Sequence, residues 1–191
     1  MLKLVGVCLI ASLCSTGADD NMLGKGLWSL IAVENCPEEE LQQEWMRLEV
    51  NKHKVNRSHD GLSVHITINN EVNDQYGTFI DICKYVDGGC KQYQVVSDNL
   101  AKLCDNYAKD NVVRALQMAK FNTDYFPLDV GEYDLKDFMI DYCSFPSDCP
   151  FGRYEAMTFL MSGGQKVACL KVIVECTKCE DDDECCDDGD Q

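Results

Sequence analysis

The three histidines of the chain lie close together in the sequence, at positions 53, 59 and 65. A histidine beside a serine or cysteine nucleophile can act as the general base of a hydrolase. The chain contains no G-x-S-x-G segment and no other serine or cysteine motif that would mark a nucleophile. We therefore interpret His53, His59 and His65 as surface residues, and we predict that the protein is not an enzyme.

Cysteines are the second set of groups that could carry chemistry. Cys176 and Cys179 are separated by two residues, and Cys185-Cys186 follow shortly after. Four thiolates suffice for tetrahedral zinc coordination, but in a secreted protein the same spacing is more typical of a disulfide framework. We favour disulfides here, and we predict no metal site and no cofactor.

Composition narrows the class of protein further. The chain has 191 residues, of which 33 are acidic and 17 are basic, and its net charge is −16. A nucleic-acid-binding protein needs a basic face, so we expect no nucleic-acid partner. The 46% of hydrophobic residues can form a core, and 13 cysteines are too many for an ordinary cytosolic protein.

The N-terminus is typical of a secretory signal peptide. A basic start at residues 1–3 precedes an apolar run over 4–14, and small residues follow at 15–18. The run is too short to cross a membrane. We predict a signal peptide over 1–18, a folded domain over 19–179 and an acidic, cysteine-containing tail over 180–191. Removal of Cys8 and Cys14 from the thirteen cysteines leaves eleven, so one is free or bonds to another chain.

Asn56-Arg57-Ser58 is the only N-x-[ST] sequon in the chain. In the secretory pathway this motif accepts an N-linked glycan, and it then lies on the surface. We predict that Asn56 is glycosylated.

Alternation of apolar and polar residues predicts a mainly β protein. Residues 62–69 alternate strictly, and we expect 78–83 to form the neighbouring strand. Residues 154–161 and 166–176 flank Gly163-Gly164, which predicts a hairpin. Further strands are expected over 133–140 and 46–50. Helical spacing over 97–120 predicts one or two helices capped by Ser97 or Asp98. We therefore expect an antiparallel β-sandwich with a helical insertion as a lid.

Several segments, in order, are similar to a known family. Two of them are residues 126–138 (FPLDVGEYDLKDF) and 152–174 (GRYEAMTFLMSGGQKVACLKVIV). Upstream stand Glu34-Asn35-Cys36, residues 78–83 with Cys90, and Leu103-Cys104-Asp105. Together they resemble the ganglioside-activator family (sphingolipid activators) of the MD-2-related lipid-recognition superfamily. Each motif alone is weak, but the shared order spans most of the mature chain.

The resemblance implies a β-cup with an apolar cavity for lipid acyl chains. It implies disulfides between Cys36 and Cys169 and between Cys83 and Cys90. The chain departs from the family at residues 121–130, which contain no cysteine, so Cys104 lacks its expected partner there. We leave open a bond from Cys104 to one of the four later cysteines, Cys176, Cys179, Cys185 and Cys186. We expect a small loop closed by Cys143 and Cys149.

The apolar strand positions are the candidate cavity wall. They are Leu62, Val64, Ile66, Ile68, Ile80, Ile82, Tyr133, Leu135, Phe138, Ile140, Leu170, Val172 and Val174. The sequence alone favours a dry, packed sandwich core made by these faces, and the resemblance reverses that preference.

Aromatic loops are the candidate membrane-facing mouth of the cup. They contain Phe121, Tyr125, Phe126, Tyr142, Phe145 and Phe151. Rings of this kind suit an interface at the depth of lipid headgroups. The alternative, in which these loops pack on their own domain, is equally compatible with the sequence.

The sequence therefore predicts a secreted or lysosomal lipid-binding protein that is not itself an enzyme. It would carry a glycolipid, phospholipid or fatty acid, or present a lipid to a lysosomal glycosidase, with transient membrane contact. The alternative is a secreted disulfide-rich interaction protein of defence, venom or extracellular matrix. In that case the acidic tail would bind cations or a basic partner.

Overall fold

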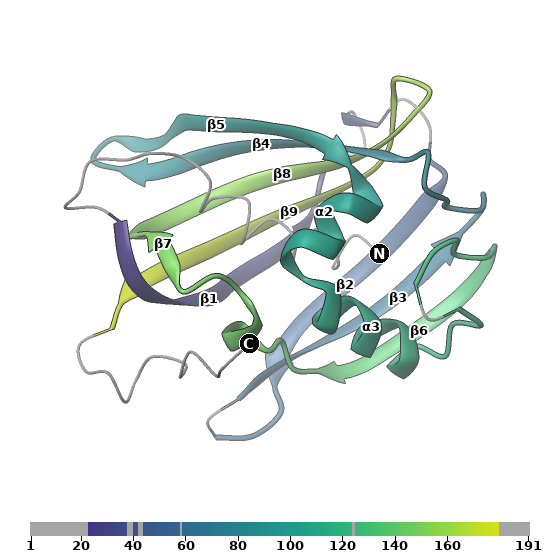
Figure 1. The fold of residues 1–191 in the computed structure, drawn as a ribbon, viewed down its shortest axis with the longest axis horizontal. Coiled ribbons are helices and arrows are strands. Elements are labelled where there is room, and N and C mark those ends of the chain that lie inside the picture. The colour runs from purple at the N-terminus through teal and green to yellow at the C-terminus, as the bar shows by residue number, and fades with distance from the viewer. Residues whose placement is uncertain (1–22, 38–39, 42–43, 58, 124, 180–191) are drawn as a thin grey trace.

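The structure is a computed structural model that describes residues 23–37, 40–41, 44–57, 59–123 and 125–179. The predicted signal peptide and the acidic tail, with Cys185 and Cys186, lie outside the described residues. Two antiparallel sheets and a pair of helices make up the described part (Figure 1). The expected fold class, mainly β with a helical insertion, is confirmed.

The larger sheet contains six strands and is curled. Its spatial order is β5 (Gly89–Asn99), β4 (Gly77–Val86), β8 (Gly152–Ser162), β9 (Gln165–Lys178), β1 (Leu23–Asn35) and β7 (Asp148–Pro150). The predicted hairpin is β8–β9, and Gly163 and Gly164 form its turn with φ angles of 55° and 80°. Positive φ at both central turn positions matches the right-handed twist of the flanking strands, and glycine adopts it without strain.

The smaller sheet contains three strands, in the order β2 (Met46–Lys54), β3 (Asp60–Ile68) and β6 (Gly131–Phe138). β3 is the strand whose alternation was strictest. Its predicted pairing with residues 78–83 is wrong, because those residues belong to β4, which pairs with β5 and β8 in the larger sheet. The partners of β3 are β2 and β6.

Two helices stand between the strands, α2 (Leu100–Tyr107) and α3 (Lys109–Met118). Asn99 caps α2 by accepting a hydrogen bond from the backbone N–H of Lys102, so the predicted cap at Ser97 or Asp98 is wrong. α2 contacts the edge strand β5 and α3 contacts the edge strand β6, so the pair joins one sheet to the other (Figure 1). No helix among the described residues is long and apolar enough to span a membrane.

On the other side of the molecule, the sheets approach each other along β1 and β2. There the ammonium group of Lys52 donates hydrogen bonds to the carbonyl oxygens of Leu30, at 2.6 Å, and Ile31, at 3.3 Å. The buried side chains of both sheets and both helices form one continuous hydrophobic cluster. The cluster lies between the two sheets and under the helices.

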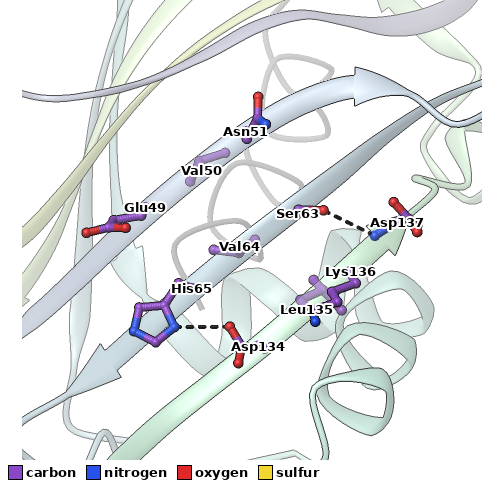
Figure 2. A pocket seen from close by; sticks show the side chains of 10 residues that line it. All are labelled: Glu49, Val50, Asn51, Ser63, Val64, His65, Asp134, Leu135, Lys136 and Asp137. Atoms are coloured by element: carbon purple, nitrogen blue, oxygen red, sulfur yellow. Dashed lines mark hydrogen bonds and ion pairs between the residues drawn. The ribbon is translucent and has the colours of Figure 1, made fainter.

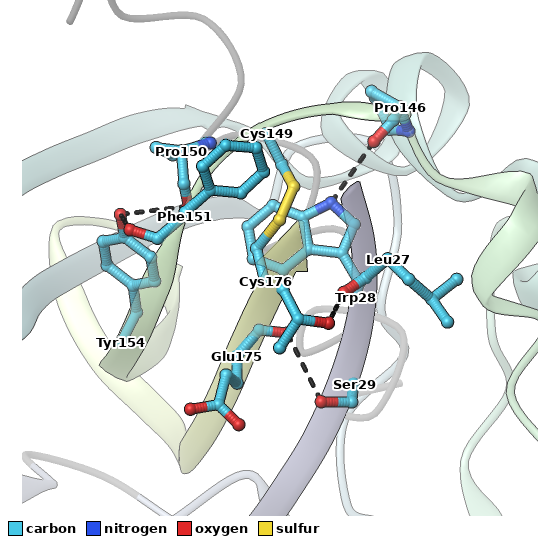
Figure 3. The surroundings of a disulfide bond; sticks show 11 residues. Leu27, Trp28, Ser29, Pro146, Cys149, Pro150, Phe151, Tyr154, Glu175 and Cys176 are labelled. Atoms are coloured by element: carbon cyan, nitrogen blue, oxygen red, sulfur yellow. Dashed lines mark hydrogen bonds between the residues drawn. A yellow bond between two sulfur atoms is a disulfide. The ribbon is translucent and has the colours of Figure 1, made fainter. Parts of the chain in front are cut away.

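Disulfides tie the larger sheet together. Cys36 is bonded to Cys169 and Cys83 to Cys90, which are the two pairs that the resemblance implied. The expected pair of Cys143 and Cys149 is wrong, because Cys149 is bonded to Cys176 (Figure 3). The reason is topological: both β7, which carries Cys149, and β9, which carries Cys176, pair with β1.

The remaining cysteines follow from this pairing. Cys143 and Cys179 are disulfide-bonded as well, and Cys104 is a buried free thiol. The bond from Cys104 to a later cysteine, which the sequence left open, is therefore not formed. Since Cys176 and Cys179 are in disulfides, they hold no zinc. The described residues contain no cluster of metal-ligating side chains.

Candidate functional site

The inner face of the smaller sheet is formed by alternate residues of its three strands. Leu62, Val64, Ile66 and Ile68 of β3 are all buried, while the intervening Ser63, His65 and Thr67 are partly exposed. Because side chains alternate along a strand, the apolar set faces the other sheet as one stripe. Leu135 and Phe138 of β6 continue the stripe, as do Met46 and Leu48 of β2.

The inner face of the larger sheet is apolar in the same way. Ile80 and Ile82 of β4 are fully buried, and so are the predicted β9 residues, Leu170, Val172 and Val174. Of the predicted wall residues only Tyr133 and Ile140 are partly exposed, and both pack against the core. All thirteen predicted wall positions thus lie in, or against, the cluster between the sheets.

Several residues of the inner face were missed by sequence reasoning. Trp28 and Leu30 of β1 and Tyr154 and Ala156 of β8 are buried there. Their strands alternate in the same way, with Tyr154, Ala156, Thr158 and Leu160 on the buried face of β8. In β8, the alternation of buried and partly exposed positions along residues 154–158 is the sequence signal that could have identified Tyr154 and Ala156.

The aromatic loops are packed on the protein itself. Phe145 is only 5% exposed, so it does not face solvent as expected for a membrane contact. Phe121 stacks on Tyr133 with ring centroids 3.7 Å apart, and Tyr125 meets Phe126 edge to face at 4.8 Å. The other two aromatic loop residues, Tyr142 and Phe151, are partly buried and pack against the core as well. These contacts favour the alternative in which the loops cover their own domain.

A buried asparagine holds one of these loops in place. The side-chain amide of Asn111, on α3, donates to the carbonyl oxygen of Asp141 at 2.9 Å and to Ser144 Oγ at 2.6 Å. Its oxygen accepts from the backbone N–H of Asp141 at 3.0 Å. The following Tyr142 hydroxyl accepts a hydrogen bond from the backbone N–H of Leu30, and burial raises the pKa of this phenol. The loop is therefore tied to both α3 and β1.

His53 and His65 lie on the outer side of the smaller sheet, away from the core, and His59 lies in the exposed turn between β2 and β3. A shallow hollow of about 380 Å³ crosses this face, and His65, Ser63 and Asp134 are among its lining residues (Figure 2). His65 Nδ1 is 3.1 Å from Asp134 Oδ1, and this hydrogen bond is the main reason that the pKa of His65 is raised above its ordinary value. His53 Nε2 is 2.6 Å from Asp137 Oδ1.

The hollow does not assemble a nucleophile with its base. The hydroxyl oxygen of Ser63 accepts a hydrogen bond from the backbone N–H of Asp137, at 3.4 Å. The two imidazoles contact carboxylates instead, so no serine–histidine hydrogen bond forms among the described residues. These histidines are surface residues, as predicted.

Asn56 lies at the tip of the β2–β3 hairpin and is exposed. Its side-chain oxygen accepts from the backbone N–H of His59 at 2.9 Å. The position is therefore compatible with the predicted glycan.

Comparisons with known proteins add no relative: no family model matches the chain, and a search of curated proteins finds no similar sequence. The inner faces of the two sheets form one buried apolar cluster, whereas the histidine hollow is shallow and the aromatic loops pack on the domain itself.

Proposed function

We propose that this is a secreted or lysosomal lipid-binding protein that holds an acyl chain between the inner faces of its two sheets. It would act as a carrier, or present a lipid to a lysosomal glycosidase, as proteins of the ganglioside-activator type do. The observation that carries the proposal is the pair of apolar faces. They bring Leu62–Ile68 of β3 and Leu170–Val174 of β9 into one buried cluster.

The covalent framework supports the same proposal. The bonds Cys36–Cys169 and Cys83–Cys90 are those that the family resemblance implies. The first joins the C-terminal end of β1 to β9, and the second lies within the β4–β5 hairpin. Both bonds therefore lie within the larger sheet, at the positions where the resemblance implies them.

Hydrocarbon burial alone can provide the required affinity. Each methylene transferred from water to an apolar surface contributes about 0.8 kcal/mol. A long acyl chain therefore needs no charged contact with the protein to remain bound. The net charge of −16 does not oppose this mode of binding, because the ligand is held by its apolar part.

Titration of delipidated protein with a fluorescent fatty acid, phospholipid or glycolipid tests the proposal. We expect saturable binding of about one lipid per chain to at least one of the three. Absence of saturable binding to all of them would overturn the proposal.

A pair of neighbouring variants makes the test specific to the inner face. Val172 faces the interior beside Ala156 and Val33, whereas the adjacent Ile173 is on the outer face beside Glu155. If the faces hold lipid, Val172→Phe reduces the affinity for lipid and leaves the lipid-free fold intact. Ile173→Phe leaves the affinity unchanged. In a filled core, Val172→Phe would instead destabilise the lipid-free protein by about 1–3 kcal/mol.

Truncation of the chain tests whether the acidic tail contributes to lipid binding. A chain that ends at Cys179 should bind lipid as the full chain does. Loss of function in the truncated chain, with lipid binding retained, would favour the alternative of a tail-driven interaction protein.

A further inference from the structure

One hydroxyl group on the inner face has no partner in the described part of the chain. Thr158, on β8, is fully buried, and its Oγ1 atom forms no hydrogen bond there. Buried hydroxyl groups in proteins are nearly always hydrogen-bonded, because an unpaired one loses its hydration without compensation. Valine has almost the same shape and would avoid this cost. The hydroxyl group of Thr158 is therefore best explained by a hydrogen-bond partner that does not belong to the described chain.

The strand register fixes the surroundings of Thr158. It lies directly opposite Ile80 of β4 on one side and Leu170 of β9 on the other. Directly paired residues share a face of the sheet. Ile80 and Leu170 are both fully buried and belong to the proposed lipid-binding face. The unpaired hydroxyl thus lies in the middle of that face.

A second unpaired oxygen lies on the same face. Gln94 of β5 is paired with Ile82, the next inward residue of β4, and its Oε1 atom is buried without a hydrogen-bond partner in the described chain. Ile82 is in turn paired with Ala156, which lies two residues before Thr158 on β8. The apolar face therefore contains two unpaired oxygen atoms, Thr158 Oγ1 and Gln94 Oε1.

We propose that the bound lipid carries a hydroxyl group within its apolar segment, and that Thr158 is the residue that recognises it. A threonine hydroxyl can both donate and accept, and an amide oxygen accepts. A ligand hydroxyl is complementary to either, whereas a plain hydrocarbon chain would leave both unpaired. This inference rests on the proposed function, and it names the substrate class of the same site.

The test uses delipidated full-length protein with octadecanoic acid and a series of its mono-hydroxy derivatives, with the hydroxyl placed from near the carboxyl end to near the methyl end. Affinities are measured for wild type, Thr158→Val and Thr158→Ser. For at least one derivative we expect the ratio of its affinity to that of octadecanoic acid to fall about three- to tenfold in Thr158→Val. Thr158→Ser, which keeps the hydroxyl, should retain the wild-type ratio.

Each result decides the inference. A ratio that is the same in wild type and Thr158→Val for every derivative, with octadecanoic acid still bound by both, would overturn this inference alone. If wild type shows no saturable binding of any member of the series, the proposed lipid-binding function fails, and this inference fails with it. Because octadecanoic acid itself needs no hydroxyl, its binding separates the two failures. Circular dichroism of each variant verifies that the fold is unchanged.

Discussion

Cys149 and Cys176 are joined by a disulfide (Figure 3), and both sulfur atoms lie close to Gly26 of β1. A Cβ atom added to Gly26 would lie 2.8 Å from Cys176 Sγ and 2.9 Å from Cys149 Sγ. The same Cβ atom would lie 2.6 Å from the carbonyl oxygen of Thr177, so glycine at this position makes room for both the bridge and the backbone of β9. The neighbouring Trp28 is paired with Cys176 and donates a hydrogen bond from its indole N–H to the carbonyl oxygen of Pro146.

The first prediction concerns this close approach. Gly26→Ala should prevent the Cys149–Cys176 bond from forming in its native position, which removes about 3 kcal/mol of stability. Thiol titration of the denatured, unreduced protein should detect two additional free cysteines. Gly77→Ala is the control, because its nearest atoms would be 3.6 and 3.8 Å away and its bonds should be unaffected. A native thiol count in Gly26→Ala would contradict the account.

The second prediction compares the two bonds that the resemblance implied. Cys36 and Cys169 are 133 residues apart, whereas Cys83 and Cys90 are 7 apart. In the chain-entropy model a longer loop stabilises more, so replacing Cys36 and Cys169 by serine should cost about 5 kcal/mol, and replacing Cys83 and Cys90 about half as much. Urea unfolding of both double variants measures this order. Equal losses of unfolding free energy in the two double variants would show that the entropy of loop closure does not determine how much each disulfide stabilises the protein.

The third prediction concerns the buried Asn111. Asn111→Ala should destabilise the protein by about 2–4 kcal/mol, because the backbone N–H and C=O of Asp141 lose their partner inside the protein. Amide exchange at Asp141 and Cys143 should accelerate more than in the strands. Asn99→Ala, which removes a partly exposed helix cap and its hydrogen bond to the carbonyl oxygen of Asp74, should cost only about 1–2 kcal/mol. A loss in Asn111→Ala no larger than in Asn99→Ala would argue against this role.

The fourth prediction concerns pH. The carboxylate of Asp134 raises the pKa of His65, with smaller contributions from Glu132 and Glu49. A raised folded-state pKa adds stability that is fully present below the unfolded pKa, near 6.5, and is lost as pH rises through the folded value. Asp134→Asn should therefore lower the His65 pKa in an NMR titration, and stability should depend less on pH in this range. An unchanged His65 titration would exclude Asp134 as the cause.

The strands that were predicted correctly carry a local signal. β3 alternates over its whole length because one face is buried and the other is in contact with solvent. The β8–β9 turn is marked by two glycines, and both have positive φ. In contrast, β1 and β5 were missed. β5 is an edge strand that is exposed over much of its length, including Val95, and the first four residues of β1 include Gly24 and Gly26, which are unfavourable inside strands. Apolar and polar residues do not alternate clearly enough in these two strands for the sequence to predict them.

The pairing of strands and cysteines depends on long-range topology. β4 follows β3 in the chain, but it pairs with β8, whose residues are far away in sequence. No local pattern encodes that choice, since a strand with one apolar face can join either sheet. In the same way Cys149 bonds to Cys176 across β1 because β7 and β9 both pair with β1. The burial of the predicted wall positions could be read from the sequence because an alternating face is a local pattern, whereas Thr158 was missed because a polar residue interrupts the apolar pattern.

The most direct test of the central claim, that an acyl chain lies between the two sheets, is native mass spectrometry of the secreted protein purified without detergent. The account predicts a mass that exceeds the polypeptide and its glycan by one lipid per chain. This increment should disappear on delipidation and return when lipid is added back. A mass that corresponds to polypeptide and glycan alone, with no lipid taken up on addition, would contradict the claim.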